Sequence, residues 1–187
     1  MSGKLVVVSA PSGTGKTTIV QKILEILPNT ARLITTTTRE KRPGEVEGKD
    51  YYFVTKEDFV EKIGKGEFLE YNQYAGNSYG TEKVKLEELQ KQYDFVFAVI
   101  DVNGKMNLDA LHIPNISIFI LPESLEVLRA RIEKRASLSQ EQLEQRLDEV
   151  RTEIDKGKGY DYQVINREGK MEETVEEILA FLEKKDK

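Results

Sequence analysis

Hydrophobic and polar residues alternate along this chain with two periods, one typical of strands and one typical of helices. Short apolar runs predict strands at Leu5–Val8, Phe95–Ile100, Ser117–Leu121 and Tyr162–Ile165. The middle two are almost continuously apolar, as expected of parallel strands covered on both faces. Between and after them, apolar residues recur at helical spacing. These stripes are Val20, Ile23, Leu24 and Leu27; Leu143, Leu147, Val150 and Ile154; and Val175, Ile178, Leu179 and Leu182. The pattern predicts an α/β fold built on a parallel sheet.

Two segments interrupt this alternation. Residues 33–81 are rich in Thr, Tyr, Gly and Glu, and predict short strands and turns with one helix near Lys56–Ile63. Residues 126–146 are highly charged and contain several arginines. We therefore expect a core with two insertions. The predicted boundaries are 1–32, 83–125 and 147–187 for the core, 33–82 for the first insertion and 126–146 for the second.

Composition narrows the class of protein. The chain has 187 residues, which suits one globular unit with a substantial core. It has no cysteine, so disulfides and thiolate metal sites are excluded, and a cytoplasmic setting is expected. The first residues lead directly into the first predicted strand, so we expect no signal peptide. No apolar run approaches the roughly 20 residues that span a bilayer. A net charge of −5 argues against nucleic acid as a partner, so anionic ligands require local clusters of Arg and Lys.

The most informative motif joins the first strand to the first helix. The loop after Val8 reads Ser-Ala-Pro-Ser-Gly-Thr-Gly-Lys-Thr and ends in Lys16 and Thr17. Glycines let backbone N–H groups point inward, and a helix N-terminus adds partial positive charge, so such a loop can cradle phosphates. Lys16 can reach the β and γ phosphates, and the Thr17 hydroxyl can hold Mg²⁺. We predict a nucleoside triphosphate site here, comprising Ser12, Gly13, Thr14, Gly15, Lys16, Thr17 and Thr18.

The motif departs from its usual pattern at one position, because Ala10 stands where the first Gly is expected. The plainer interpretation is a glycine-rich turn without a ligand. A lysine at a helix start is unfavourable unless an anion is bound there, which favours the phosphate site.

A second group of polar residues lies in the first insertion. Residues 35–42 read Thr-Thr-Thr-Thr-Arg-Glu-Lys-Arg and are followed by Pro43 and Gly44. Arg39 and Arg42 on one loop can bind a phosphate monoester with both guanidinium groups. A solvated basic turn is an equally good interpretation of this composition alone.

With these segments the chain resembles guanylate kinases over nearly its whole length. The resemblance rests on the phosphate loop, Thr38-Arg39 through Glu45, Gly48 through Tyr51, Gly76 through Gly80 and Ile100 through Gly104. It implies Mg²⁺-dependent phosphorylation of GMP by ATP in purine nucleotide metabolism. It also implies a P-loop NTPase-type parallel sheet with helices on both faces, a β-rich GMP-binding insertion (33–82) and a helical lid (126–146).

The resemblance also implies roles for individual residues. Arg39, Arg42, Tyr51 and Tyr79 match positions that hold the GMP phosphate. Thr35, Glu70, Thr81 and Asp101 match positions around guanine, and Asn166 matches a contact to the ATP adenine. Arg131, Arg135 and Arg146 match lid arginines that close on the transferring phosphates, so the expected catalytic residues are Lys16, Arg39, Arg131, Arg135 and Arg146.

Guanine chemistry suits these residue types. Guanine shows two neighbouring donors, N1–H and the 2-amino group, and a carboxylate such as Glu70 accepts both. Its O6 suits a hydroxyl donor such as Thr35 or Thr81. The plainer interpretation of Glu70 is a glutamate on the exposed face of a strand, between inward-facing Leu69 and Tyr71.

Three residues depart from the family pattern. Val99 replaces the first Asp of an Asp-x-Asp pair whose second member is Asp101, Ala136 replaces a Gly after Arg135, and Arg167 replaces an acidic residue after Asn166. We therefore expect Mg²⁺ to be held mainly by Thr17, phosphate oxygens and water.

Two alternatives to a guanylate kinase stay open. One is a catalytically inactive guanylate-kinase-like module that binds protein partners. The other keeps the phosphate loop and phosphorylates another nucleotide or a phosphorylated sugar. Lys16 and the lid arginines argue against the first, and Glu70 with Thr35 argues against the second. We expect a monomer or homodimer without a membrane partner, and a structural or surface role for His112.

Overall fold

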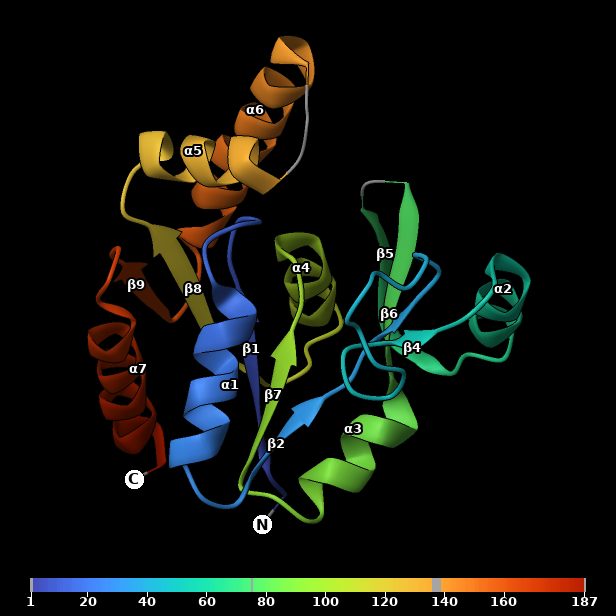
Figure 1. The fold of residues 1–187 in the computed structure, drawn as a ribbon. Coiled ribbons are helices and arrows are strands. Elements are labelled where there is room, and N and C mark those ends of the chain that lie inside the picture. The colour runs from blue at the N-terminus through green and yellow to red at the C-terminus, as the bar shows by residue number, and fades with distance from the viewer. Residues whose placement is uncertain (1, 75, 136–138, 187) are drawn as a thin grey trace. The chain divides into compact units, whose positions relative to one another are not determined.

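The computed structural model describes residues 2–74, 76–135 and 139–186, without the side chains of Arg135 and Asp186. It divides by contacts into two units (Figure 1). The first unit holds the residues up to Val6 together with Asn29–Asn115, and the second holds Val7–Pro28 and Ile116–Lys187. These divisions follow contacts within the folded chain, whereas the predicted core, insertion and lid follow sequence composition and stay a prediction.

The main sheet has five strands in the order β2-β7-β1-β8-β9. Their bounds are β1 Lys4–Ser9, β2 Thr30–Leu33, β7 Phe95–Val99, β8 Ile116–Pro122 and β9 Tyr162–Asn166. β2 pairs with β7 in parallel, and β8 pairs with β9 in parallel. Val6, Phe97 and Phe119 are fully buried, as expected of strands covered on both faces.

A second sheet of four short strands lies in the first unit, in the order β4-β3-β6-β5. These strands are β3 Thr36–Thr37, β4 Tyr52–Phe53, β5 Phe68–Tyr74 and β6 Asn77–Glu82. β5 and β6 are antiparallel, with an irregular register between Phe68 and Glu70. A Cβ at Gly80 would approach the Phe68 ring to 2.7 Å, so this glycine lets the strand pass close to the stacked Phe59 and Phe68 rings.

Helices complete both units. The first unit has α2 Lys56–Gly64, α3 Lys83–Gln90 and α4 Val102–Ala110, and the second has α1 Lys16–Ile26, α5 Leu125–Arg135, α6 Gln140–Gly157 and α7 Met171–Asp186. In the second unit α1 packs beside α7 (Figure 1). None of the described helices combines the length and apolar character needed to cross a membrane.

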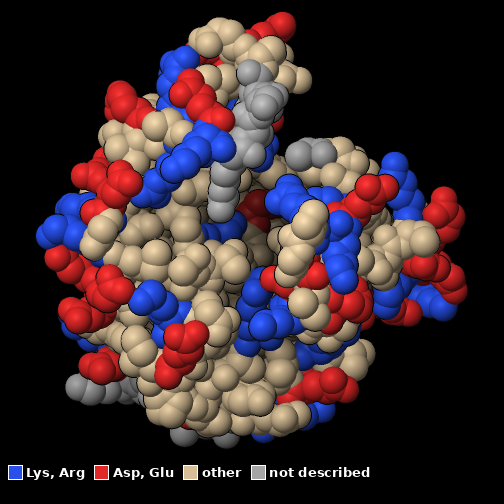
Figure 2. All heavy atoms as spheres, in the orientation of Figure 1, with Lys and Arg blue, Asp and Glu red and all other residues tan. Residues whose placement is uncertain are grey.

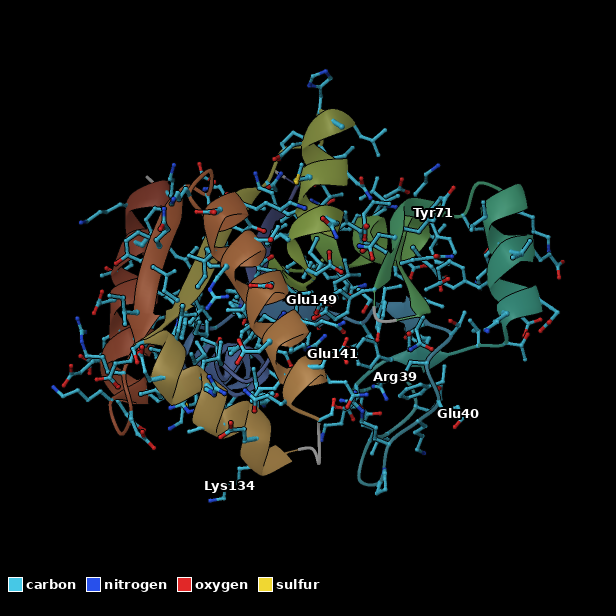
Figure 3. All side chains as sticks on the ribbon, turned by 90° about the horizontal axis from the view of Figure 1, so that it is seen from above. Arg39, Glu40, Tyr71, Lys134, Glu141 and Glu149 are labelled. Atoms are coloured by element: carbon cyan, nitrogen blue, oxygen red, sulfur yellow. The ribbon has the colours of Figure 1, made fainter. Side chains whose placement is uncertain are left out.

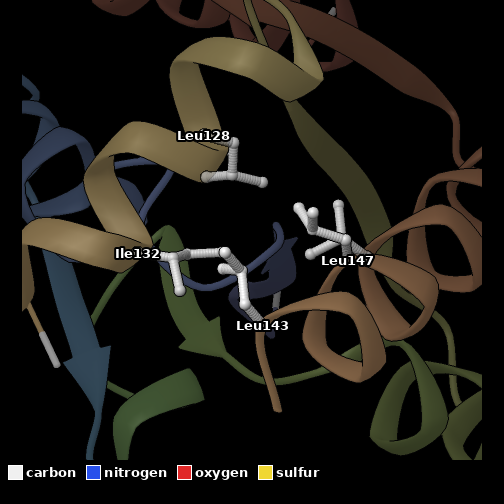
Figure 4. Packing of buried hydrophobic residues seen from close by; sticks show 5 residues of the cluster. Leu128, Ile132, Leu143 and Leu147 are labelled. Carbon is white, nitrogen blue, oxygen red and sulfur yellow. The ribbon is translucent and has the colours of Figure 1, made fainter. Parts of the chain in front are cut away.

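A small apolar cluster joins α5 to α6. Leu128 and Ile132 on α5 pack against Leu143 and Leu147 on α6 (Figure 4). α6 starts with a capping box, in which the Ser139 hydroxyl accepts from the Gln142 backbone and the Gln142 side chain accepts from the Ser139 backbone. The described parts of α5 and α6, which overlap the predicted 126–146 segment, are therefore a helix pair held by packing.

The strands predicted from apolar runs are all confirmed. The predicted helices after the phosphate loop, near Lys56–Ile63, around the stripe from Leu143 to Ile154 and at the C-terminal end are confirmed as well. β2 was not predicted, because Thr30–Leu33 is mostly half-buried and lacks an apolar run. α3 and α4 were also missed. The four stripe residues Leu24, Leu27, Ile154 and Leu179 are only half-buried, and Glu153 is buried on α6 beside the predicted stripe.

Candidate functional site

The phosphate loop lies in the second unit, between β1 and α1. Gly13 and Gly15 adopt φ values of 90° and 94°, a left-handed conformation that side chains rarely adopt. Gly15 is the N-cap of α1, and the first turn of this helix has neither a side-chain cap nor an acidic residue. No acidic side chain of the first turn therefore neutralises the positive N-terminus of α1, which suits the binding of an external phosphate.

Lys16 opens α1, and its side chain lies back over the loop. Its Nζ donates to the Ala10 carbonyl over 3.4 Å. The acceptor, Ala10, is the residue that stands where the usual pattern has glycine, and it is buried. Thr17 and Thr18 follow in the first turn and are exposed, as is Ser12, whereas Thr14 is fully buried.

Two side chains from distant parts of the second unit support this loop. Asn166, at the end of β9, is buried and donates from Nδ2 to the Thr14 carbonyl over 2.7 Å. Arg131 on α5 donates to the Gly13 carbonyl over 3.4 Å. A Cβ at Gly15 would lie 3.1 Å from Asn166 Nδ2, so the glycine also makes room for this amide.

A cavity of about 530 Å³ opens at the loop. Five of its lining residues were predicted, and six were not. The predicted ones are Gly13, Gly15, Thr18, Arg131 and Asn166; the others are Lys22, Lys134, Arg167, Gly169, Met171 and Glu172. Lys22 and Glu172 form an ion pair of 2.8 Å between α1 and α7. Sequence spacing could not predict this side of the cavity, because the Lys22–Glu172 pair joins the first helix to the last.

The other two predicted lid arginines are Arg135 and Arg146. Arg146 on α6 pairs with Glu149 over 2.8 Å, and it is not among the described residues that line the cavity. The side chain of Arg135 and all of Ala136 lie outside the described residues. Their roles stay predictions.

The second site lies in the first unit, on β5, β6 and the start of α4. Glu70 on β5 is only 5% exposed, whereas its neighbour Tyr71 is 48% exposed. The interpretation of Glu70 as an exposed strand residue is therefore wrong. The side chains of β5 alternate with Glu70 inward and Tyr71 outward, the reverse of that interpretation.

The carboxylate of Glu70 is only half satisfied. Its Oε1 accepts the hydroxyl hydrogen of Thr81 over 2.6 Å, and its Oε2 is buried with no hydrogen-bond partner among the described residues. Burial raises the pKa of Glu70 to about 7; the hydrogen bond from Thr81 opposes this shift, and the charge of Asp101 adds to it. An uncompensated carboxylate at this depth is costly, and a bound donor would relieve the cost.

Asp101 occupies the N-cap of α4. Its Oδ1 accepts from the backbone N–H groups of Asn103 and Gly104 over 2.8 and 3.0 Å, and from Asn72 Nδ2 over 3.2 Å. Thr35 precedes β3 and is buried, and its backbone carbonyl accepts from Tyr52. The structure thus brings Glu70, Thr81 and Asp101 together, and adds Asn72, which the sequence analysis did not name.

Arg39 lies on the segment after β3 (Figure 3), and Arg42 follows it three residues later. Arg39 donates to Glu45 over 2.6 Å and lies over the Tyr51 ring, 5.4 Å from its centroid. Tyr51 meets Tyr79 edge-on with centroids 6.0 Å apart. Arg42 is exposed, and its backbone N–H donates to the other oxygen of Glu45 over 2.8 Å.

Glu45 is therefore the residue that orders this loop. Burial acts to raise the pKa of Glu45, but the hydrogen bonds from Arg39 and Arg42 outweigh it and hold this pKa below its ordinary value. The sequence analysis missed Glu45 as a site residue, although its spacing of three from Arg42 was a usable signal.

The described residues contain no group of three His, Cys, Asp or Glu side chains that could hold a metal ion. Val99, at the end of β7, is half-buried. On the face displayed in Figure 2, basic and acidic side chains are interspersed.

The parallel sheet, the left-handed glycines and the lysine at the start of α1 define a P-loop nucleotide-binding protein. The family model for guanylate kinase matches residues 2–185, and the chain belongs to the guanylate kinase family.

Curated relatives and solved structures agree with this family. A guanylate kinase of Wolbachia sp. subsp. Brugia malayi is 44% identical over 97% of this chain and 93% of its own length. One of Geobacter metallireducens is 39% identical over 96% of this chain and 88% of its own length. The crystal structure of guanylate kinase from Anaplasma phagocytophilum superposes with a TM-score of 0.79 at 33% identity, covering 98% of this chain and 86% of that one.

Proposed function

We propose that this chain transfers the γ-phosphoryl group of ATP to GMP, producing ADP and GDP. The observation that carries the proposal is the buried Glu70, with one oxygen bound by Thr81 and the other without a partner among the described residues. Guanine offers two adjacent N–H donors to such a carboxylate, whereas adenine presents a lone pair at N1 and would be repelled. Family membership supports the same acceptor and donor.

The donor nucleotide is proposed to bind at the phosphate loop. Backbone N–H groups at Gly13–Thr18 and the Lys16 ammonium would hold its phosphates, and the cavity beside Asn166 would receive the adenosine. Arg131 already lies on the Gly13 carbonyl, so a small shift of its guanidinium would bring it to a phosphate oxygen. Arg135 and Arg146 are proposed to join when the lid closes.

Magnesium fits this donor site through a single protein ligand. Thr17 is exposed in the first turn of α1, directly after Lys16. Mg²⁺ commonly keeps several waters and binds phosphate oxygens with one or two protein groups, so one hydroxyl suffices. The ion would neutralise charge on the β and γ phosphates.

The acceptor phosphate is proposed to bind at Arg39, Arg42, Tyr51 and Tyr79. A guanidinium has five N–H donors, and the bonds of Arg39 to Glu45 and to the Glu40 carbonyl use two of them. Glu45 would keep Arg39 oriented while its remaining donors meet the phosphate. Thr35, Thr81, Asp101 and Glu70 would surround the base.

The proposal extends to the setting of the enzyme. We propose a cytoplasmic monomer or homodimer that binds ATP and GMP. We propose no nucleic-acid partner and no membrane partner.

An acceptor series tests the proposal. ADP release would be measured with GMP, AMP, CMP and UMP at equal concentration, with ATP and Mg²⁺. We expect GMP to be preferred by about 10⁴-fold or more, because a site built on polar pairing rejects the wrong base strongly. Turnover with none of the four would support an inactive interaction module. Preference for another acceptor would overturn the assignment of Glu70.

A further inference from the structure

Asn72 lies beside Asp101 and has no role in the proposed reaction. Its Nδ2 donates to Asp101 Oδ1 over 3.2 Å, and its Oδ1 is buried with no hydrogen-bond partner among the described residues. A carboxylate can only accept at this point, so the nitrogen must be the atom that faces Asp101. The amide oxygen therefore faces the other way, as a second buried acceptor without a donor.

The position of Asn72 ties it to the base end of the proposed acceptor site. It follows Glu70 by two residues on β5, so both side chains lie on the same face of the strand. A Cβ at Gly104 on α4 would lie 3.1 Å from Glu70 Oε2 and 3.2 Å from Asn72 Nδ2. Both side chains thus border the same bare stretch of helix backbone.

A count of donors and acceptors shows what could satisfy them. Guanine carries three N–H hydrogens in this region. N1–H and one hydrogen of the 2-amino group lie on its Watson–Crick edge, and the second amino hydrogen points toward N3. Glu70 can accept two of them. Asp101 Oδ1 already accepts three hydrogens, from Asn72, Asn103 and Gly104. The remaining amino hydrogen needs an acceptor. Besides Asp101 Oδ2, the structure offers Asn72 Oδ1, which is buried with no partner among the described residues.

We infer that Asn72 is a specificity-determining residue, whose Oδ1 accepts a hydrogen from the 2-amino group of guanine while its Nδ2 holds Asp101. The inference rests on the proposed function and deepens it, because it names the substituent that is recognised. Hypoxanthine lacks only this amino group, so IMP would leave Asn72 Oδ1 unsatisfied in the complex. Neither Glu70 Oε2 nor Asn72 Oδ1 is accessible to water here, so base entry includes a local opening.

The experiment compares GMP with IMP, and GMP with dGMP, as acceptors for Asn72→Ala and the unaltered enzyme. We expect Asn72→Ala to lower kcat/KM for GMP about tenfold more than kcat/KM for IMP. The lost bond from Nδ2 to Asp101 affects both acceptors, whereas only GMP also loses a hydrogen bond to Oδ1. The ratio of kcat/KM for GMP to kcat/KM for dGMP should be the same in the variant and the unaltered enzyme. Gln73→Ala is the matched control, since Gln73 is the next amide on the same strand and is exposed.

The outcomes separate the inference from the proposal beneath it. A GMP/IMP ratio that is the same in Asn72→Ala and the unaltered enzyme would overturn the role of Asn72 alone. A change in the GMP/dGMP ratio instead would move Asn72 to the ribose and also overturn it. Absence of GMP turnover in the unaltered enzyme would overturn the proposed function itself. If Asn72→Ala loses both acceptors and its cooperative thermal unfolding, the same ratios are measured on Asn72→Ser, whose hydroxyl is too short to reach.

Discussion

The Thr81 hydroxyl donates to Glu70 Oε1 over 2.6 Å, and the two residues are direct cross-strand partners on β6 and β5. This bond satisfies one oxygen of a carboxylate that is almost completely buried. It fixes which oxygen stays available for a ligand. The pairing therefore turns a feature of sheet register into a feature of base recognition.

Glu70→Gln should impair the use of GMP far more than that of ATP. An amide offers one acceptor and two donors, so it cannot accept both N1–H and the 2-amino group. We expect the KM or Kd for GMP to rise about 100-fold, with the KM for ATP changing less than about threefold. Steady-state kinetics with each substrate varied in turn measures both. Equal losses for the two nucleotides would remove Glu70 from the guanine site.

The same substitution should stabilise the folded chain at alkaline pH. Burial raises the pKa of Glu70 from 4.5 to about 7, so between these values the folded state binds more protons than the unfolded state. The free energy of unfolding therefore falls as pH rises through this window, by about 3 kcal/mol at most. Glu70→Gln removes this penalty and should raise stability at pH 8 while changing it little at pH 4.5. Urea unfolding at the two pH values measures the difference.

GMP affinity should depend on the ionisation of Glu70. With a pKa of about 7, the Glu70 carboxyl of the free site is mostly protonated at pH 6. Guanine N–H donors require the carboxylate, so GMP binding at this pH should release most of that proton. We expect affinity to rise with pH up to about 7 and then level off. Calorimetry in buffers of different ionisation enthalpy counts the protons released.

The phosphate of GMP also titrates, with a second pKa of about 6. Its ionisation therefore makes a separate contribution to the dependence of GMP affinity on pH. Glu70→Gln is the control that isolates this contribution, because only the phosphate titrates in the variant. An identical pH profile in both proteins would show that Glu70 is already ionised in the free site.

Sequence patterns could predict the donor site better than the acceptor site. The phosphate loop is contiguous, so the conformations of Gly13 and Gly15 and the position of Lys16 follow from local sequence alone. The support of Thr14 by Asn166 joins residues 152 apart in sequence, and only the resemblance to a family pointed to it.

The acceptor site depends on register and burial. Tyr71 and Leu69 are more hydrophobic than Glu70, so the strand's own pattern favours the wrong face inward. The packing of Phe68 against Phe59 and the pairing of Glu70 with Thr81 outweigh that preference. Asn72 became visible only because its oxygen lacks a partner among the described residues in the folded chain.

Lys16→Ala should nearly abolish turnover and leave GMP binding intact. Lys16 belongs to the phosphate loop of the second unit, whereas Glu70 and Arg39 belong to the first. We expect kcat to fall at least about 100-fold, as for loss of a preorganised charge on the transferring group. Calorimetry with GMP should give an unchanged Kd. Lys158→Ala, an exposed lysine of the same unit paired with Asp155, is the matched control. A loss of turnover below tenfold would contradict the assigned role.

Val99→Asp tests whether the missing carboxylate limits this enzyme. Val99 ends β7, half-buried, where the family pattern has an acidic residue, and Thr17 alone is proposed to hold Mg²⁺. Because Mg²⁺ keeps water ligands readily, an added carboxylate contributes little to its binding, and we expect kcat to change less than about tenfold. Turnover would be measured across a Mg²⁺ titration, with Val99→Asn as an isosteric control that lacks the charge. A gain of several orders of magnitude in Val99→Asp, absent in Val99→Asn, would show that Val99 severely limits catalysis in the natural chain.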